Sequence, residues 1–69
     1  MDLTASQSRV LSFIKDHIDS MGFPPTRSEI AKGLGFSSNN ASQCHLVALQ
    51  KQGVISLSPK VSRGIKLTN

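Results

Sequence analysis

Uncharged polar side chains gather between residues 38 and 44. This stretch holds Ser38, Asn39, Asn40, Ala41 and Gln43, followed by the only cysteine, Cys44. Amide and hydroxyl groups can hydrogen-bond to the edges of DNA bases, and an alanine methyl group can contact the methyl group of thymine. The alternative is that Ser38 only caps a helix and the asparagines are merely solvated. For Cys44, the alternative to a base contact is a small, half-buried filler.

A second group of residues could bind phosphate groups. Its members are Arg27, Ser28, Lys51, Lys60 and Arg63. The first two would begin a helix, where free backbone N–H groups favour an anion. If these side chains lie on one face of the domain, the positive charge of the chain is concentrated in one binding surface. Lys15, Lys32 and Lys66 are expected to be solvated, because their positions in the predicted helices and strand give no reason to assign them to phosphate binding.

Composition and charge limit the class of protein. The chain has 69 residues, with 38% hydrophobic and 17% charged, which predicts one small packed domain over residues 1–69. Eight Lys and Arg against four Asp and Glu give a net charge of +4, and the isoelectric point near 9.9 is typical of nucleic-acid-binding domains. The apolar runs are too short for a membrane helix, and no secretory leader is evident. A reducing, cytoplasmic setting is therefore expected.

Enzymatic and metal chemistry are not expected. One cysteine excludes an internal disulfide, and the two histidines lie far apart in the sequence, without other ligands at metal-binding spacing. No nucleophile with a base, and no carboxylate pair, is arranged for catalysis. We expect no cofactor and no small-molecule ligand.

The first predicted helix begins after Thr4, which with Gln7 forms a capping box. Apolar residues then recur at helical spacing, at Val10, Leu11, Ile14, Ile18 and Met21. Gly22 suits the left-handed residue that ends many helices, and the prolines that follow exclude further helix.

Two more helices are predicted. Thr26 and Glu29 form a second capping box, and Gly35 ends the short helix that they open. A third helix is predicted over about residues 39–52, after a cluster of residues that favour helix N-caps. Its inward side is predicted to be formed by Ser42, Leu46 and Leu49.

The last sixteen residues change to a strand pattern. Residues 54–57 and 63–68 predict two strands, joined by a turn over residues 58–62. Such a hairpin is barely stable alone and must pack on the helices. The fold class is therefore mainly α with a small β-hairpin, a three-helix winged helix-turn-helix whose third helix enters the major groove.

The sequence also resembles a known family. Residues 22–31, GFPPTRSEIA, are similar to the G-x-P-P-T-R-x-E-I-A string of the LexA repressor family, and the similarity continues through residues 34–36, 38, 40–41, 45–46, 48–49, 53–55 and 62–65. The resemblance covers essentially the whole chain. It implies operator binding and transcriptional repression of the SOS, or DNA-damage, type. It also implies that the recognition helix carries the base-reading residues named above.

Two departures from the family pattern bear on function. Many LexA proteins have an acidic pair where this chain has Gln43 and Cys44. A carboxylate accepts from cytosine, whereas a glutamine side chain suits adenine, so a different operator sequence is expected. In the family, a C-terminal half dimerises and cleaves itself, and the linker that leads to it would begin near residue 69. The chain is therefore expected to be an isolated DNA-binding domain or a stand-alone relative such as a phage repressor.

Specificity on a genome needs more base pairs than one small module reads. We expect the partner to be a pseudo-palindromic double-stranded DNA operator bound by a homodimer, with the isolated domain a monomer in solution. The alternative is a winged helix used for protein–protein contact. That function would favour aromatic or apolar anchors on the third helix, where this chain has Ser, Asn and Gln.

Overall fold

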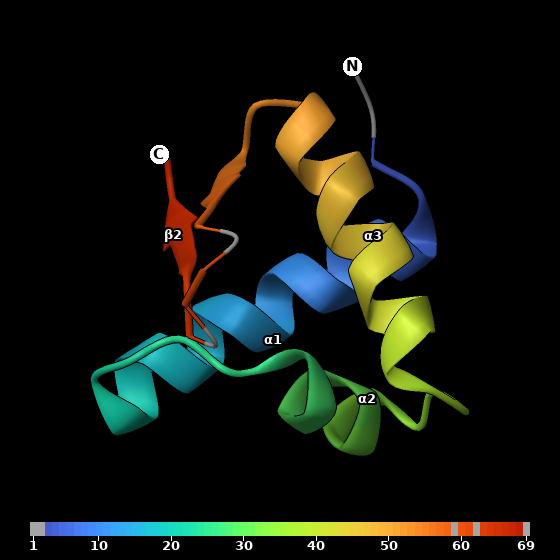
Figure 1. Cartoon of the computed structure of the whole chain (residues 1–69), viewed down its shortest axis with the longest axis horizontal. Helices are drawn as coiled ribbons and strands as arrows, with labels where there is room; N and C mark the ends of the chain where they lie inside the picture. Colours follow the sequence, from blue (N-terminus) through green and yellow to red (C-terminus); the bar gives the residue numbers. More distant parts are fainter. Residues whose placement is uncertain (1–2, 59, 62, 69) are drawn as a thin grey trace.

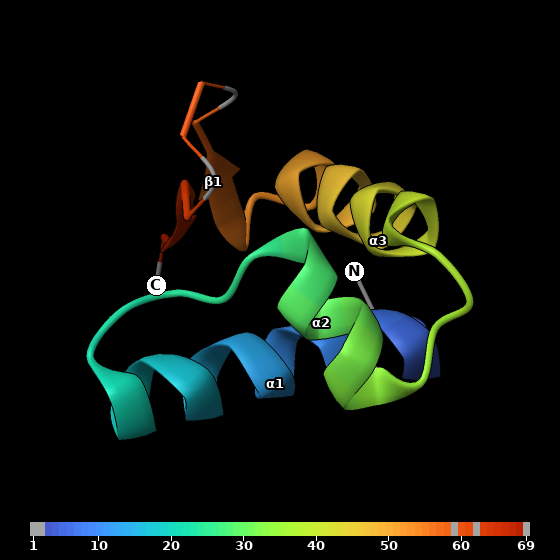
Figure 2. The ribbon, with the colours of Figure 1, turned by 60° about the horizontal axis from the view of Figure 1, so that its bottom comes forward.

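Three helices form the larger part of the computed structural model, which describes residues 3–58, 60–61 and 63–68. Helix α1 spans Ala5–Met21, α2 spans Arg27–Leu34 and α3 spans Asn39–Lys51. Each helix contacts the other two. The hairpin stands to one side of them (Figure 2). The three predicted helices are thus confirmed, with α3 one residue shorter than expected.

Local sequence determines where the helices begin and end. Thr4 Oγ1 accepts from the Gln7 amide at 3.1 Å, and Gln7 Oε1 accepts from the Thr4 amide at 3.0 Å. The second capping box forms in the same way between Thr26 and Glu29. Gly22 closes α1 at a φ of 84°. These reciprocal bonds satisfy backbone donors that a helix start leaves without partners.

The hairpin is antiparallel and short. Strand β1 spans Ile55–Leu57 and β2 spans Ile65–Leu67, with Ile55 opposite Leu67 and Leu57 opposite Ile65. The strands are shorter than the sequence predicted, and the turn residues Pro59 and Ser62 lie outside the described part. We call β1, β2 and their connection the wing. Figure 1 shows that the chain passes from the end of α3 into the wing.

One core joins the helices and the wing. Its buried apolar residues are Val10, Ile14, Ile30, Leu46, Leu49, Ile55 and Ile65. Alternation in β2 places Ile65 inward and Lys66 outward, and the expected exposure of Lys66 is confirmed. The predicted inward residues of α3, Ser42, Leu46 and Leu49, are all buried. Met21 departs from the sequence pattern. It continues the apolar spacing of α1 but is 60% exposed, because it lies in the last turn of the helix, where the chain turns away from the core.

No helix in the described residues is long and apolar enough to cross a bilayer.

Candidate nucleic-acid interface

The start of α3 presents the predicted base-reading residues on the surface. Ser38 caps the helix, with its Oγ accepting from the Ala41 amide at 3.4 Å. Asn39 and Asn40 in the first turn are exposed, whereas Ala41 is half-buried. Capping and base contact are compatible at this end, because the cap uses one side-chain oxygen and leaves the asparagine side chains outside.

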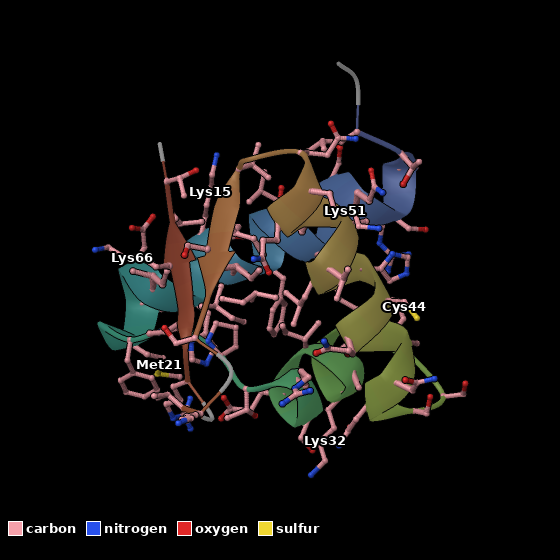
Figure 3. All side chains as sticks on the ribbon, turned by 45° about the horizontal axis from the view of Figure 1, so that its top comes forward. Lys15, Met21, Lys32, Cys44, Lys51 and Lys66 are labelled. Atoms are coloured by element: carbon pink, nitrogen blue, oxygen red, sulfur yellow. The ribbon has the colours of Figure 1, made fainter. Side chains whose placement is uncertain are left out.

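Cys44 lies on the outer side of α3 (Figure 3) and is exposed. The alternative that it is a half-buried filler is therefore wrong. Val47, one turn further along, is 36% exposed and is the one large apolar residue of α3 with such exposure. The outer side of α3 thus lacks the aromatic anchors that dominate protein–protein interfaces.

An open hollow of about 530 Å³ lies between the starts of α2 and α3. Its walls are Thr26, Arg27, Ser28, Asn39, Asn40 and Gln43. The fold therefore brings two predicted phosphate-binding residues, Arg27 and Ser28, beside three predicted base-reading residues. We call it the α2–α3 hollow.

A second hollow of about 280 Å³ lies between α3 and the wing. It is lined by Arg27, Gln43, Leu46, Val47, Gln50, Leu57, Ser58, Val61, Gly64 and Ile65. Val47 of α3 therefore faces the wing. Arg27 and Gln43 line both hollows, and Arg27 Nη1 donates to Gln43 Oε1 at 2.8 Å.

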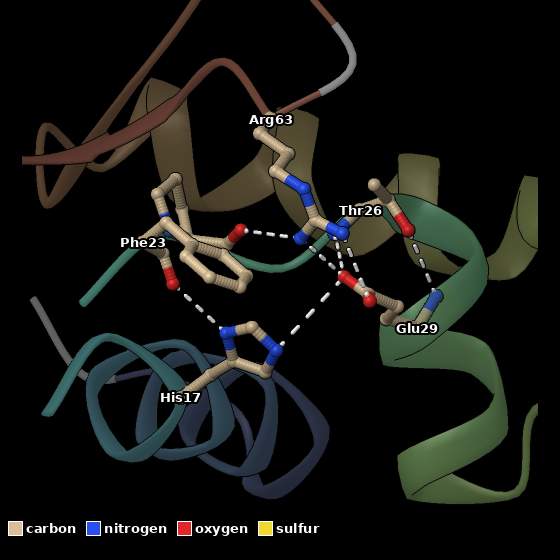
Figure 4. A network of polar contacts seen from close by, with 6 residues as sticks. His17, Phe23, Thr26, Glu29 and Arg63 are labelled. Atoms are coloured by element: carbon tan, nitrogen blue, oxygen red, sulfur yellow. Dashed lines mark hydrogen bonds and ion pairs between the residues drawn. The ribbon is translucent and has the colours of Figure 1, made fainter. Parts of the chain in front are cut away.

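The wing is attached to the start of α2 through Arg63 (Figure 4). Its Nη1 lies 2.6 Å from Glu29 Oε1 and its Nη2 lies 3.1 Å from Glu29 Oε2. Nη1 also donates to the Pro24 carbonyl at 3.0 Å, and the guanidinium carbon lies 4.6 Å from the centre of the Phe23 ring. Two hydrogen bonds to one carboxylate, together with stacking on an aromatic ring, fix the orientation of a guanidinium.

His17 supports the same network from α1. Its Nδ1 donates to the Phe23 carbonyl at 2.9 Å, and its Nε2 lies 3.9 Å from Glu29 Oε1. The hydrogen bonds from Arg63 and from the Thr26 backbone lower the pKa of Glu29 from 4.5 to about 2. Glu29 therefore stays a carboxylate at neutral pH and holds both the helix cap and the wing.

The remaining predicted phosphate-binding residues lie at the ends of this surface. Lys51 is exposed in the last turn of α3, at the opposite end of the helix from the asparagines (Figure 3). Lys60 is exposed in the connection between the strands. The structure does not bring all five phosphate-binding candidates into one cluster; Arg27 and Ser28 are adjacent, and the other three are distributed around α3 and the wing.

Sequence reasoning assigned Glu29 only a capping role and missed its contact with Arg63. The two residues are 34 positions apart, and no local pattern links them. Among the described residues, no three His, Cys, Asp or Glu side chains gather to hold a metal.

Three helices, a wing and a helix start lined with hydrogen-bonding groups define a winged helix-turn-helix domain of the DNA-binding class. The family model for the LexA DNA binding domain matches residues 1–64, and the chain belongs to that family.

Named relatives agree with this assignment. The chain is 55% identical over 65 residues to a LexA repressor of Herminiimonas arsenicoxydans, covering 94% of this chain and 30% of the relative. It is 54% identical over 67 residues to a LexA repressor of Marinobacter nauticus, covering 97% and 33%. A LexA repressor of Pseudomonas aeruginosa is 52% identical over 65 residues, covering 94% and 32%. The chain spans about a third of the length of these curated relatives.

Proposed function

We propose that this chain, as one domain over residues 1–69, binds a DNA operator sequence-specifically and so represses transcription of the SOS type. The observation that carries the proposal is the α2–α3 hollow, where uncharged hydrogen-bonding side chains of α3 lie beside Arg27 and Ser28. Base edges are read by such uncharged groups, whereas phosphates are held by cations and helix N-termini. The family membership and the named repressors support the same function.

Each part of the surface has a role in this proposal. The first turns of α3 enter the major groove, where Ser38, Asn39, Asn40, Ala41, Gln43 and Cys44 contact bases. Arg27, Ser28, Lys51 and Lys60 bind phosphates on either side. Arg63 joins them through its remaining N–H groups, but its main role is to hold the wing, since Glu29 occupies both terminal nitrogens.

The operator is a pseudo-palindrome bound by two copies, and the isolated domain is a monomer in solution. Two half-sites are needed because one good base contact discriminates by only about 1–3 kcal/mol. The site of action is the bacterial nucleoid, in the cytoplasm. The chain itself performs no catalysis.

The test starts from DNA selected from a randomised duplex library by this chain fused to a dimerising partner. Asn40→Ala should then lower affinity for the selected duplex by about 1–3 kcal/mol and leave affinity for random duplex nearly unchanged. An unchanged ratio of specific to random binding in Asn40→Ala would show that α3 does not read bases through this residue. Sedimentation of the unfused chain at micromolar concentration should show a monomer; a tight dimer would overturn that part.

A further inference from the structure

The hydrogen bond between Arg27 and Gln43 determines which atoms the glutamine can offer to DNA. Arg27 is the first residue of α2 and Gln43 lies in the second turn of α3, so the contact crosses between the two helices of the helix-turn-helix. Arg27 Nη1 and Gln43 Oε1 are 2.8 Å apart. This distance is in the range of charge-assisted hydrogen bonds, which are shorter and stronger than those between neutral groups.

The chemistry of arginine orients the amide of Gln43. A guanidinium has only N–H donors and no acceptor. Of the two ends of the amide, only the oxygen can therefore face Arg27, and the reversed orientation would place N–H groups against N–H groups. Because the amide is planar, its Nε2 points away from Arg27. Gln43 is half-buried and lines both hollows, so this amide lies within the surface that faces DNA.

An oriented glutamine differs in its base preference from a free one. A free glutamine pairs with adenine by accepting from N6 and donating to N7 at the same time. Here one lone pair of the oxygen accepts from Arg27. The N6 amino group of adenine could reach the second lone pair only beside the cationic guanidinium, where donor would face donor. The groups left to contact a base are therefore the Nε2 amino group of Gln43 and the other N–H groups of Arg27. Guanine, with N7 and O6, presents two acceptors on its major-groove edge and matches such a set of donors.

We propose that Arg27 and Gln43 form one recognition unit that selects guanine, rather than adenine, at one position of each half-site. In this unit, Arg27 determines base preference by orienting the amide of Gln43. This role is separate from any contact that Arg27 makes with a phosphate. The proposal rests on the proposed function, because it requires that α3 lies in the major groove.

The experiment measures base preference at every position of the selected duplex by competition binding at one fixed salt concentration. The proteins are the unchanged chain, Arg27→Met, Gln43→Ala and Asn40→Ala, with Lys32→Met as a matched control on the exposed side of α2. Met retains much of the length of the stem without the donors. Thermal unfolding of each variant checks that it is folded. A duplex with 7-deazaguanine at the position that Gln43→Ala affects then removes only the N7 acceptor.

The unchanged chain should prefer guanine to adenine at the Gln43-dependent position by about 5- to 150-fold, the range of a good two-bond contact. Replacement by 7-deazaguanine should lower affinity by about 5-fold, as expected for one lost hydrogen bond. Arg27→Met should move the preference at this position toward adenine, because the released oxygen can now accept from N6. Lys32→Met should leave the base profile unchanged.

Three results would overturn the proposal. One is a preference of the unchanged chain for adenine at this position. Another is an unchanged base profile in Arg27→Met with weaker binding to all duplexes, which would make Arg27 a phosphate contact only. The third is a Gln43→Ala variant whose profile is unchanged at every position. In that third case, a changed profile in Asn40→Ala would show that the proposed function holds while the Arg27–Gln43 unit fails; if neither variant changes the profile, the proposed function fails as well.

Discussion

Arg63 of the wing and Glu29 of α2 are joined by two hydrogen bonds, of 2.6 and 3.1 Å. The same carboxylate accepts from the Thr26 backbone at 2.8 Å, so the residue that caps α2 also anchors the wing. Glu29 therefore links the wing to the start of α2, in addition to the core contacts of Ile55 and Ile65, and several consequences can be measured.

Breaking this ion pair should loosen the wing and leave the helices intact. In Arg63→Met, the amides of Ser58 and Thr68, which donate to Gly64 and Val54, should exchange hydrogen severalfold faster, while amides of α1 remain unchanged. Glu29→Gln should produce the same change, since Gln can still cap the helix but carries no charge. Exchange measured by NMR checks this.

Arg63→Lys separates positioning from charge. Lys keeps the positive charge but cannot form the paired hydrogen bonds. If Arg63 mainly positions the wing, Arg63→Lys should lose most of the DNA affinity that Arg63→Met loses. Retention of nearly full affinity by the lysine variant would indicate a simple phosphate contact.

The free energy of unfolding should fall on acidification, over a pH range that the pKa of Glu29 determines. Its pKa is lowered from 4.5 to about 2 in the folded chain, so its carboxylate stabilises the fold above pH 4.5. That contribution should be lost as the pH falls from about 4.5 toward about 2, because the unfolded chain binds the proton first. Urea unfolding in steps across this window should show a smaller decline for Glu29→Gln than for the unchanged chain. Asp19→Asn, at an exposed position of α1, is the control and should retain the full decline.

Gly64 should not tolerate a side chain. A Cβ atom there would lie 2.6 Å from the Ser58 carbonyl oxygen and 2.9 Å from that of Val61. Both are backbone atoms, so the wing itself must deform. Gly64→Ala should destabilise the chain by about 1–3 kcal/mol, as overpacking does, and weaken DNA binding. Chemical denaturation measures the first effect, with Ser56→Ala on exposed β1 as the control; equal stability of the two variants would contradict the prediction.

Lys60→Ala should weaken binding to selected and random duplexes alike. If Lys60 neutralises one phosphate, its loss should reduce the slope of log affinity against log salt by about 0.9. Titrations at several salt concentrations give the slope. Lys15→Ala, an exposed position of α1, should leave it unchanged; equal slopes for both variants would remove Lys60 from the interface.

Ser42→Ala should stabilise the chain. Ser42 is fully buried in α3, and its hydroxyl has no hydrogen-bond partner among the described residues. Removing an unpaired buried hydroxyl should stabilise the fold by about 1 kcal/mol. Ser12→Ala, at an exposed position of α1, controls for the higher helix propensity of alanine. A loss of stability in Ser42→Ala alone would mean that the hydroxyl has a partner.

Local sequence determined the secondary structure and the class of protein. Thr4, Thr26 and Ser38 mark the three helix starts, and Gly22 and Gly35 follow two of the ends, because capping depends only on residues a few positions apart. The strand pattern of residues 63–68 likewise indicated β2. The family followed from the residues themselves.

Only the tertiary structure decided which side chains are partners. Arg63 was predicted to bind phosphate, but its guanidinium faces Glu29, 34 positions away. Gln43 was expected to suit adenine, and only the packing of α2 against α3 shows that Arg27, 16 positions away, donates to its oxygen. The physical reason is that a helix start depends on its own neighbours in the chain, whereas the partner of a long polar side chain depends on how separate elements pack.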